Sequence, residues 1–366
     1  MNVKRLLETV PEDRDAEARA WEVVRAAFAD HEPMRRPRPV RLGVALAAAV
    51  AIAVAAALSP PGQAVVNAVR RTIGLEHAAP ALFRLPAPGR LLVSGPGGAW
   101  VVSADGSKRR LGDWPQAAWS PHGLFVVGAT HDTLAAVEPD DGVVHWSLAR
   151  PRIAFPRWGG SRTDTRVAYL TASRLHVVAG DGTRDVDVGG LPAAARVAPA
   201  WRPGDRHVLA YVTARGRLYV IDTDEGSVSW ISPGYARPRA LAWSPDGKRL
   251  ALAAQSRVVL FDARTGHARS IRVSGVRSLA FARDGRLALL RGRYVLELRR
   301  GTIRTLFAAP GRLDGLAWSP DGRWLLTELR GADQWIFVGR DRVLAVSHIA
   351  HQFGGAPVLD GWMPGA

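Results

Sequence analysis

The sequence predicts an all-β domain, a seven-bladed β-propeller over residues 83–366, preceded by a short cytoplasmic helix and one transmembrane helix. Three observations lead to this prediction. A short motif built on an aromatic residue recurs with a period near 40 residues, the length of one four-stranded blade. Seven strand–turn–strand hairpins recur with the same period. One unmatched strand at the C-terminus complements one unmatched hairpin at the start of the repeats, which predicts a closed ring.

Residues 1–41 form the first predicted unit, a cytoplasmic helical segment with a basic linker. Pro11 is followed by a cluster of acidic residues, the pattern of a helix first turn, and we expect the helix to run to Asp30. Trp21, Val24 and Phe28 fall on one face of that helix. A helix this short cannot bury such a stripe by folding alone, so we expect it either to lie on the inner leaflet or to dock on a cytoplasmic protein.

Residues 42–58 form the predicted transmembrane helix. This stretch of 17 residues has no charged or polar side chain, and Pro60 and Pro61 end it. It would span roughly 25 Å, the lower limit for crossing a bilayer. Five arginines lie shortly before it and two shortly after it, so the N-terminus is expected inside and the repeats outside. A cleaved signal peptide is the alternative, but its leader of 41 residues would be unusually long. Residues 59–82 are the juxtamembrane linker.

The repeat motif is clearest around Trp243 and Trp318, where both copies contain Trp-Ser-Pro-Asp-Gly followed by a basic residue. A strand ends on the aromatic residue, Ser-Pro-Asp-Gly makes a tight turn, and an apolar return strand follows. We expect the aromatic side chains to fill the gaps between neighbouring blades. The seven anchors are 39, 43, 42, 38, 37 and 44 residues apart. They are Trp119, Trp158, Trp201, Trp243, Phe281, Trp318 and Trp362.

The hairpins give an independent count of seven units, and each has a turn between two apolar strands. They span residues 99–111, 134–148, 175–188, 218–231, 258–271, 294–307 and 335–347. Only six anchor strands precede a hairpin, because Trp362 has none after it. The strand around Trp362 is therefore expected to pair with the blade that begins at Leu91 and close the ring. A six-bladed ring with one irregular unit is the alternative.

The Trp-Ser-Pro-Asp-Gly-Arg/Lys pattern resembles the WD40-like repeats of TolB-type propellers, which are common in bacterial envelope proteins. The resemblance covers about three quarters of the chain. The order of cytosolic segment, single anchor and outer propeller is also similar to that of membrane-bound anti-sigma-factor relatives of actinobacteria. The first resemblance implies a fold and leaves function open, because propellers host binding, scaffolding and catalysis alike.

Motifs for catalysis and metal binding are missing from the sequence. There is no cysteine, which excludes disulfides, thiolate metal sites and cysteine nucleophiles. No P-loop, dinucleotide fingerprint, zinc-protease motif or serine-hydrolase elbow occurs. The acidic runs 181–187 and 222–226 contain carboxylates, which are ligands for calcium. They fall in hairpin turns, however, and we expect them to be solvated. His348 and His351 lack a third ligand. We therefore predict no catalytic residue, cofactor or metal site.

The net charge of +16 comes almost entirely from arginine, since only three lysines occur. It indicates either an anionic partner or a compositional bias without function. The sequence favours a membrane-anchored extracytoplasmic module for binding, sensing or scaffolding, with a protein partner on the cytoplasmic side, for which a sigma factor is the candidate. The alternative is a propeller enzyme acting on an envelope glycan or another extracytoplasmic substrate. A membrane location would argue against a nucleic-acid partner.

Overall fold

The structure is a computed structural model that describes residues 84–188, 191–204 and 207–365. The predicted cytoplasmic helix, transmembrane helix and linker, residues 1–82, lie outside the described residues. In the part of the chain that is described, no helix is both long and apolar enough to cross a membrane.

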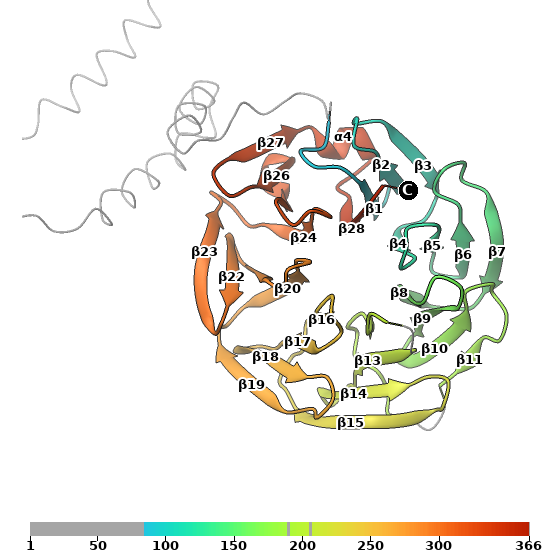
Figure 1. Ribbon diagram of the computed structural model, residues 1–366. Coiled ribbons are helices and arrows are strands. Elements are labelled where there is room, and N and C mark those ends of the chain that lie inside the picture. Colours follow the sequence, from blue (N-terminus) through green and yellow to red (C-terminus); the bar gives the residue numbers. More distant parts are fainter. Residues whose placement is uncertain (1–83, 189–190, 205–206, 366) are drawn as a thin grey trace, which may run out of the picture. The chain divides into compact units, whose positions relative to one another are not determined.

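The described strands form seven antiparallel sheets of four strands, arranged around one axis (Figure 1). Blade 1 contains β28 (Val358–Met363), β1 (Arg90–Gly95), β2 (Gly98–Val102) and β3 (Lys108–Gly112). Blade 2 contains β4 (Gln116–Trp119), β5 (Val126–Ala129), β6 (Thr133–Val137) and β7 (Val144–Ala149). Blade 3 contains β8 (Ile153–Gly160), β9 (Thr165–Thr171), β10 (Arg174–Ala179) and β11 (Val186–Asp187). Blade 4 contains β12 (Ala200–Trp201), β13 (Val208–Val212), β14 (Arg217–Asp222) and β15 (Ser227–Gly234).

The remaining three blades follow in the same order. Blade 5 contains β16 (Ala240–Trp243), β17 (Arg249–Ala253), β18 (Arg257–Asp262) and β19 (Ala268–Arg272). Blade 6 contains β20 (Val276–Phe281), β21 (Leu287–Arg291), β22 (Tyr294–Arg299) and β23 (Thr302–Ala308). Blade 7 contains β24 (Asp314–Trp318), β25 (Leu325–Leu329), β26 (Gln334–Val338) and β27 (Val343–Ser347). The prediction of seven blades, with the hairpins as the two outer strands of each, is confirmed.

The ring closes as predicted, because β28 pairs with β1 and becomes the innermost strand of blade 1. Trp362 lies opposite Leu91 in this pair. Closure leaves no unpaired sheet edge where the chain begins and ends its repeats.

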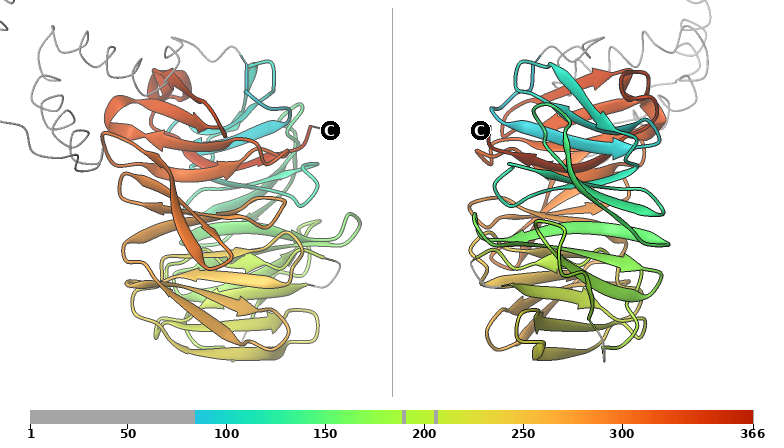
Figure 2. Two further views of the ribbon diagram at one scale, coloured as in Figure 1. Left: turned by 60° about the vertical axis from the view of Figure 1, so that its left-hand side comes forward. Right: turned by 90° about the vertical axis from the view of Figure 1, so that its right-hand side faces the viewer.

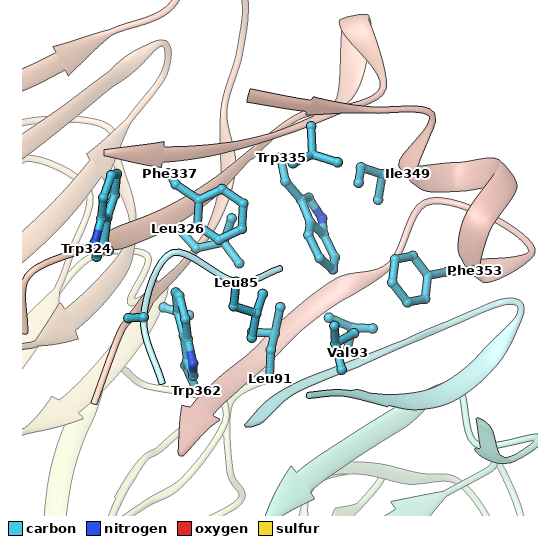
Figure 3. Packing of buried hydrophobic residues seen from close by; sticks show 14 residues of the cluster. Leu85, Leu91, Val93, Trp324, Leu326, Trp335, Phe337, Ile349, Phe353 and Trp362 are labelled. Atoms are coloured by element: carbon cyan, nitrogen blue, oxygen red, sulfur yellow. The ribbon is translucent and has the colours of Figure 1, made fainter. Parts of the chain in front are cut away.

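A continuous apolar cluster joins blade 7 to blade 1 behind this closure (Figure 3). Trp335 is fully buried and stacks on Phe353, with ring centroids 5.1 Å apart. Phe353 belongs to a short helix, α4 (Ile349–Phe353), which links the two blades and was not expected from the sequence. Ile349 and Phe353 point inward because one helical turn places both on the same side.

The Ser-Pro-Asp-Gly turns explain how each blade begins. In blade 5, the Ser244 hydroxyl donates to Asp246 and accepts the backbone N–H of Arg249 at 2.9 Å. Gly247 has a φ of +64°, a conformation that a residue with a Cβ rarely adopts. The turn therefore follows from local chemistry, and the same bonds recur at Ser319 in blade 7.

Because adjacent strands run antiparallel, the loops divide between two faces of the ring (Figure 2). We define the turn face by the loops that follow the first and third strand of each blade, and the return face by the loops that follow the second and fourth. The described chain enters β1 from the turn face, where the N–H of Leu85 donates to the carbonyl of Ala104 at 2.9 Å.

Candidate functional site

The seven aromatic anchors lie on the innermost strands of the blades. They are Trp119, Trp158, Trp201, Trp243, Phe281, Trp318 and Trp362. Four tryptophans donate their indole N–H to a backbone carbonyl on the innermost strand of the preceding blade, at 2.9 to 3.3 Å. These four are Trp119, Trp201, Trp243 and Trp318. The anchors are thus part of the contacts between blades. The other predicted residues, Trp21, Val24 and Phe28, lie outside the described residues.

Arginines from one blade cover the anchors of the next blade, a feature that the sequence analysis missed. The guanidinium groups lie 4.8 to 5.9 Å from the ring centroids, within the range of a cation–π contact. Each also donates to the turn glycine carbonyl of the next blade at 2.6 to 3.1 Å. The pairs are Arg90 with Trp119, Arg202 with Trp243, Arg249 with Phe281, and Arg286 with Trp318. Three of these arginines share a place in the repeat, because Arg90, Arg249 and Arg286 lie one or two residues after the turn glycine, where the second strand begins. The basic residue that follows the Ser-Pro-Asp-Gly turn was therefore the signal that could have found them.

In the described residues a cleft lies between blades 3 and 4 on the turn face, with a volume of about 820 Å³. Its origin is the shortness of β11. This outermost strand has two residues, whereas the outermost strands of the other six blades have five to eight. The missing length leaves Val186 56% exposed at the rim. Val177 and Ile221, both buried, form the apolar floor.

Aspartates dominate the polar lining of this cleft, which contains five aspartates and two arginines. Asp181 belongs to the β10–β11 turn and accepts the N–H and the hydroxyl of Thr183, at 3.0 and 2.7 Å. These bonds hold the pKa of the Asp181 carboxyl below its usual range. Asp222 accepts the N–H groups of Asp224 and Glu225 in the equivalent turn of blade 4. The cleft is therefore negatively charged on a chain of net charge +16.

A buried histidine holds the inner end of the cleft together. His207 is 2% exposed, and its Nδ1 lies 2.5 Å from the Asp224 carboxylate. Its Nε2 lies 3.1 Å from the backbone carbonyl of Asp164. Arg166 pairs with the carboxylates of both Asp164 and Asp224. These contacts tie the inner turn of blade 3 to the outer turn of blade 4.

The contacts of His207 are those of a residue that holds the cleft in shape. A catalytic histidine needs one ring nitrogen directed at a nucleophile or at substrate. In His207 both nitrogens are engaged, one by a carboxylate and one by a backbone carbonyl. Among residues 84–188, 191–204 and 207–365, no three His, Asp or Glu side chains are grouped so as to hold a metal ion. His348 and His351 are both exposed.

A second polar pair lies near the ring axis. Asp360 on β28 and Arg157 on β8 each keep part of their residue surface exposed. Their charged groups, however, are surrounded by protein atoms. Burial raises the pKa of Asp360 to about 7, although Ser94 and the Arg157 charge oppose the rise. Burial also lowers the pKa of Arg157. One carboxyl oxygen of Asp360 has no hydrogen-bond partner in the described structure.

No protein-family model matches the sequence, and no curated protein is similar to it in sequence. Solved structures do resemble the fold. The β-propeller domain of Cps50 (Swd1) from Myceliophteria thermophila aligns with a TM-score of 0.50 and 13% identity, over 64% of this chain and 89% of that one. A chain of the mitotic checkpoint complex aligns with a TM-score of 0.54 and 16% identity, over 69% and 90%. The fold is therefore a WD40-like seven-bladed β-propeller.

Proposed function

We propose that this chain is a membrane-anchored, non-enzymatic binding module whose cleft between blades 3 and 4 receives a segment of a partner protein. The observation that carries the proposal is the cleft itself, which combines an apolar floor with a rim of carboxylates. Peptide segments bind such sites by placing an apolar side chain on the floor and a charge of opposite sign at the rim.

The chemistry of the lining favours a segment with arginine or lysine next to an aliphatic residue. The carboxylates of Asp181 and Asp222 are held in place by turn hydrogen bonds, so they are positioned before a ligand arrives. Val186, exposed at the rim, provides apolar surface beside these charges. A volume of about 820 Å³ accommodates a few side chains, which suits a short segment rather than a whole domain surface.

A selection from a random 12-residue peptide library on the full-length protein tests this proposal. We expect enrichment of peptides with a basic residue beside Leu, Ile or Val. Their affinity should fall as salt is raised, because the attraction is partly electrostatic. The variant Val186→Lys should weaken binding at least tenfold, since it adds a positive charge and a bulky side chain at the rim.

Val228→Lys is the matched control, because Val228 is also exposed on an outer strand but does not line the cleft. It should bind the selected peptides as the wild type does. Equal loss in both variants, or enrichment of acidic peptides, would contradict the proposal.

The membrane-anchored part of the proposal rests on residues 1–82. The apolar stretch 42–58 and the arginine excess before it support an anchor with an extracytoplasmic propeller. The stripe of Trp21, Val24 and Phe28 supports a docking site for a cytoplasmic protein. A sigma factor is the partner that we propose, so that ligand binding outside would be coupled to regulation inside.

A further inference from the structure

Eight exposed arginines lie on the return face over blades 4, 5 and 6, and we name this set the arginine arc. None of them forms an ion pair with an acidic residue in the part of the chain that the structure describes. The arc consists of Arg215, Arg217, Arg237, Arg239, Arg257, Arg272, Arg291 and Arg293.

Backbone hydrogen bonds show that the loops of the arc are contiguous. The N–H of Tyr235 donates to Gly216 at 2.9 Å, which joins the two loops of blade 4. Gln255 of blade 5 then donates to Ala236 at 2.9 Å and accepts the N–H of Gly275 at 3.2 Å. The next residue along, Val276, pairs with Arg291 of blade 6. The positive charges therefore follow one continuous path across three blades.

The arc lacks compensating acidic residues, and turn chemistry gives the reason. On the turn face, aspartates accept backbone N–H groups in the tight turns, as Asp246 and Asp262 do. The return-face segments 213–217, 234–240, 254–257, 272–276 and 291–293 contain no Asp or Glu. The arc ends at Arg277, whose guanidinium pairs with Asp314 at 2.9 Å.

The arc also lacks the apolar anchors of a protein-binding surface. The large hydrophobic side chains exposed in the described residues all lie outside its segments. Protein interfaces depend on buried aromatic or aliphatic anchors, whereas polyanion binding depends on charge neutralisation along the chain. Guanidinium groups suit phosphate in particular, because they can donate two parallel hydrogen bonds to one phosphate group.

We propose that the arginine arc binds an extended chain of phosphate groups, in a polyphosphate or a phosphodiester polymer. This site lies on the face opposite to the cleft and does not depend on the function proposed for the cleft. Binding needs no conformational change, since the loops of the arc are hydrogen-bonded to one another.

Three labelled phosphate polymers serve as probes for the full-length protein: inorganic polyphosphate, poly(glycerol phosphate) and a single-stranded oligodeoxynucleotide. Polyglutamate of similar length serves as the polycarboxylate comparison. The test variant carries four substitutions on the arc. They are Arg215→Gln, Arg237→Gln, Arg257→Gln and Arg291→Gln.

The control variant removes the same charge from the turn face, at four exposed arginines without an ion pair to a described acidic residue. These substitutions are Arg264→Gln, Arg299→Gln, Arg323→Gln and Arg340→Gln. Thermal melting of both variants should match the wild type, because none of the eight side chains is buried.

The arc variant should lose roughly 30-fold or more in affinity at 0.1 M salt. The slope of log affinity against log salt should become shallower by about 3, or about 0.7 for each lost contact. The control variant should change either quantity far less.

Comparison of the three phosphate probes identifies the preferred backbone. Equal losses in the two variants would show a diffuse charge effect, and binding of polyglutamate as tight as that of the phosphate polymers would exclude phosphate recognition. Either result overturns the proposal.

Discussion

Arg286 lies with its guanidinium carbon 4.8 Å from the ring centroid of Trp318, across the boundary between blades 6 and 7. The same guanidinium donates to the carbonyl of Gly322 at 2.6 Å and lies 3.6 Å from the fully buried carboxylate of Glu297. One side chain therefore joins an aromatic anchor, a turn and a buried acid. Three other blade boundaries contain an arginine stacked in the same way.

Arg286→Met should lower the free energy of unfolding by about 2 to 3 kcal/mol, because it removes the stacking and leaves Glu297 with one cation fewer. Urea unfolding measures the effect. Arg283→Met is the matched control, since Arg283 is exposed in the same turn, and it should change stability by less than about 0.5 kcal/mol. Similar losses in the two variants would mean that the contacts of Arg286 contribute little.

Removal of residues 360–366 should strip most of the innermost strand from blade 1, expose a sheet edge and promote aggregation. Trp362→Ala alone should cost about 3 to 5 kcal/mol, since the ring is buried among residues of blades 1 and 7. A chain that ends at Met363 keeps β28 complete and should melt like the wild type. Unchanged melting after the longer deletion would show that pairing between β28 and β1 does not hold the ring closed.

Asp360 should make stability depend on pH between about 4 and 7. Its pKa is about 7 in the folded protein, against 3.8 when exposed, so the folded state holds a proton that the unfolded state releases in this range. Its contribution to stability therefore falls as pH rises. The variant Asp360→Asn has no carboxyl group to ionise, so above pH 7 it should be more stable than the wild type by up to about 4 kcal/mol. Near pH 4 the two proteins should differ little in stability. Urea unfolding at several pH values measures it, and a difference independent of pH would refute the assignment.

Reporter fusions test the orientation that the sequence predicts for residues 42–58. A reporter active only outside the cytoplasm should be active after Ala366 and inactive before Met1, because the arginine excess keeps the N-terminus inside. The reverse pattern would exclude an outer propeller.

The cytoplasmic docking stripe makes a separate prediction. Full-length protein in detergent should bind a purified sigma factor of the same organism, and Trp21→Ala with Phe28→Ala should weaken that binding at least tenfold, because both large apolar contacts are lost. The charge-preserving change Val186→Ala in the propeller is the control and should have no effect. If the wild type instead binds only anionic vesicles, the stripe is an interfacial anchor.

Much of the ring follows from local patterns in the sequence. Each blade depends on apolar alternation and on turns such as Ser244–Gly247, whose bonds form within a few residues. The unmatched strand around Trp362 was enough to predict closure, because a sheet edge left open would be unfavourable. The short helix α4 was missed, since five residues carry too weak a periodic pattern to be recognised.

The candidate sites depend on contacts between blades, which the order of residues along the chain does not show. The sequence predicts separate solvated turns at Asp181 and Asp222, whereas the ring places both on one cleft because β11 is too short to fill the space between them. The contact between Arg286 and Trp318 also depends on packing, because the way blade 6 lies against blade 7 sets the distance between the two side chains. Local chemistry thus determined the blades and their closure, whereas the packing of one blade on the next decided which charges lie together.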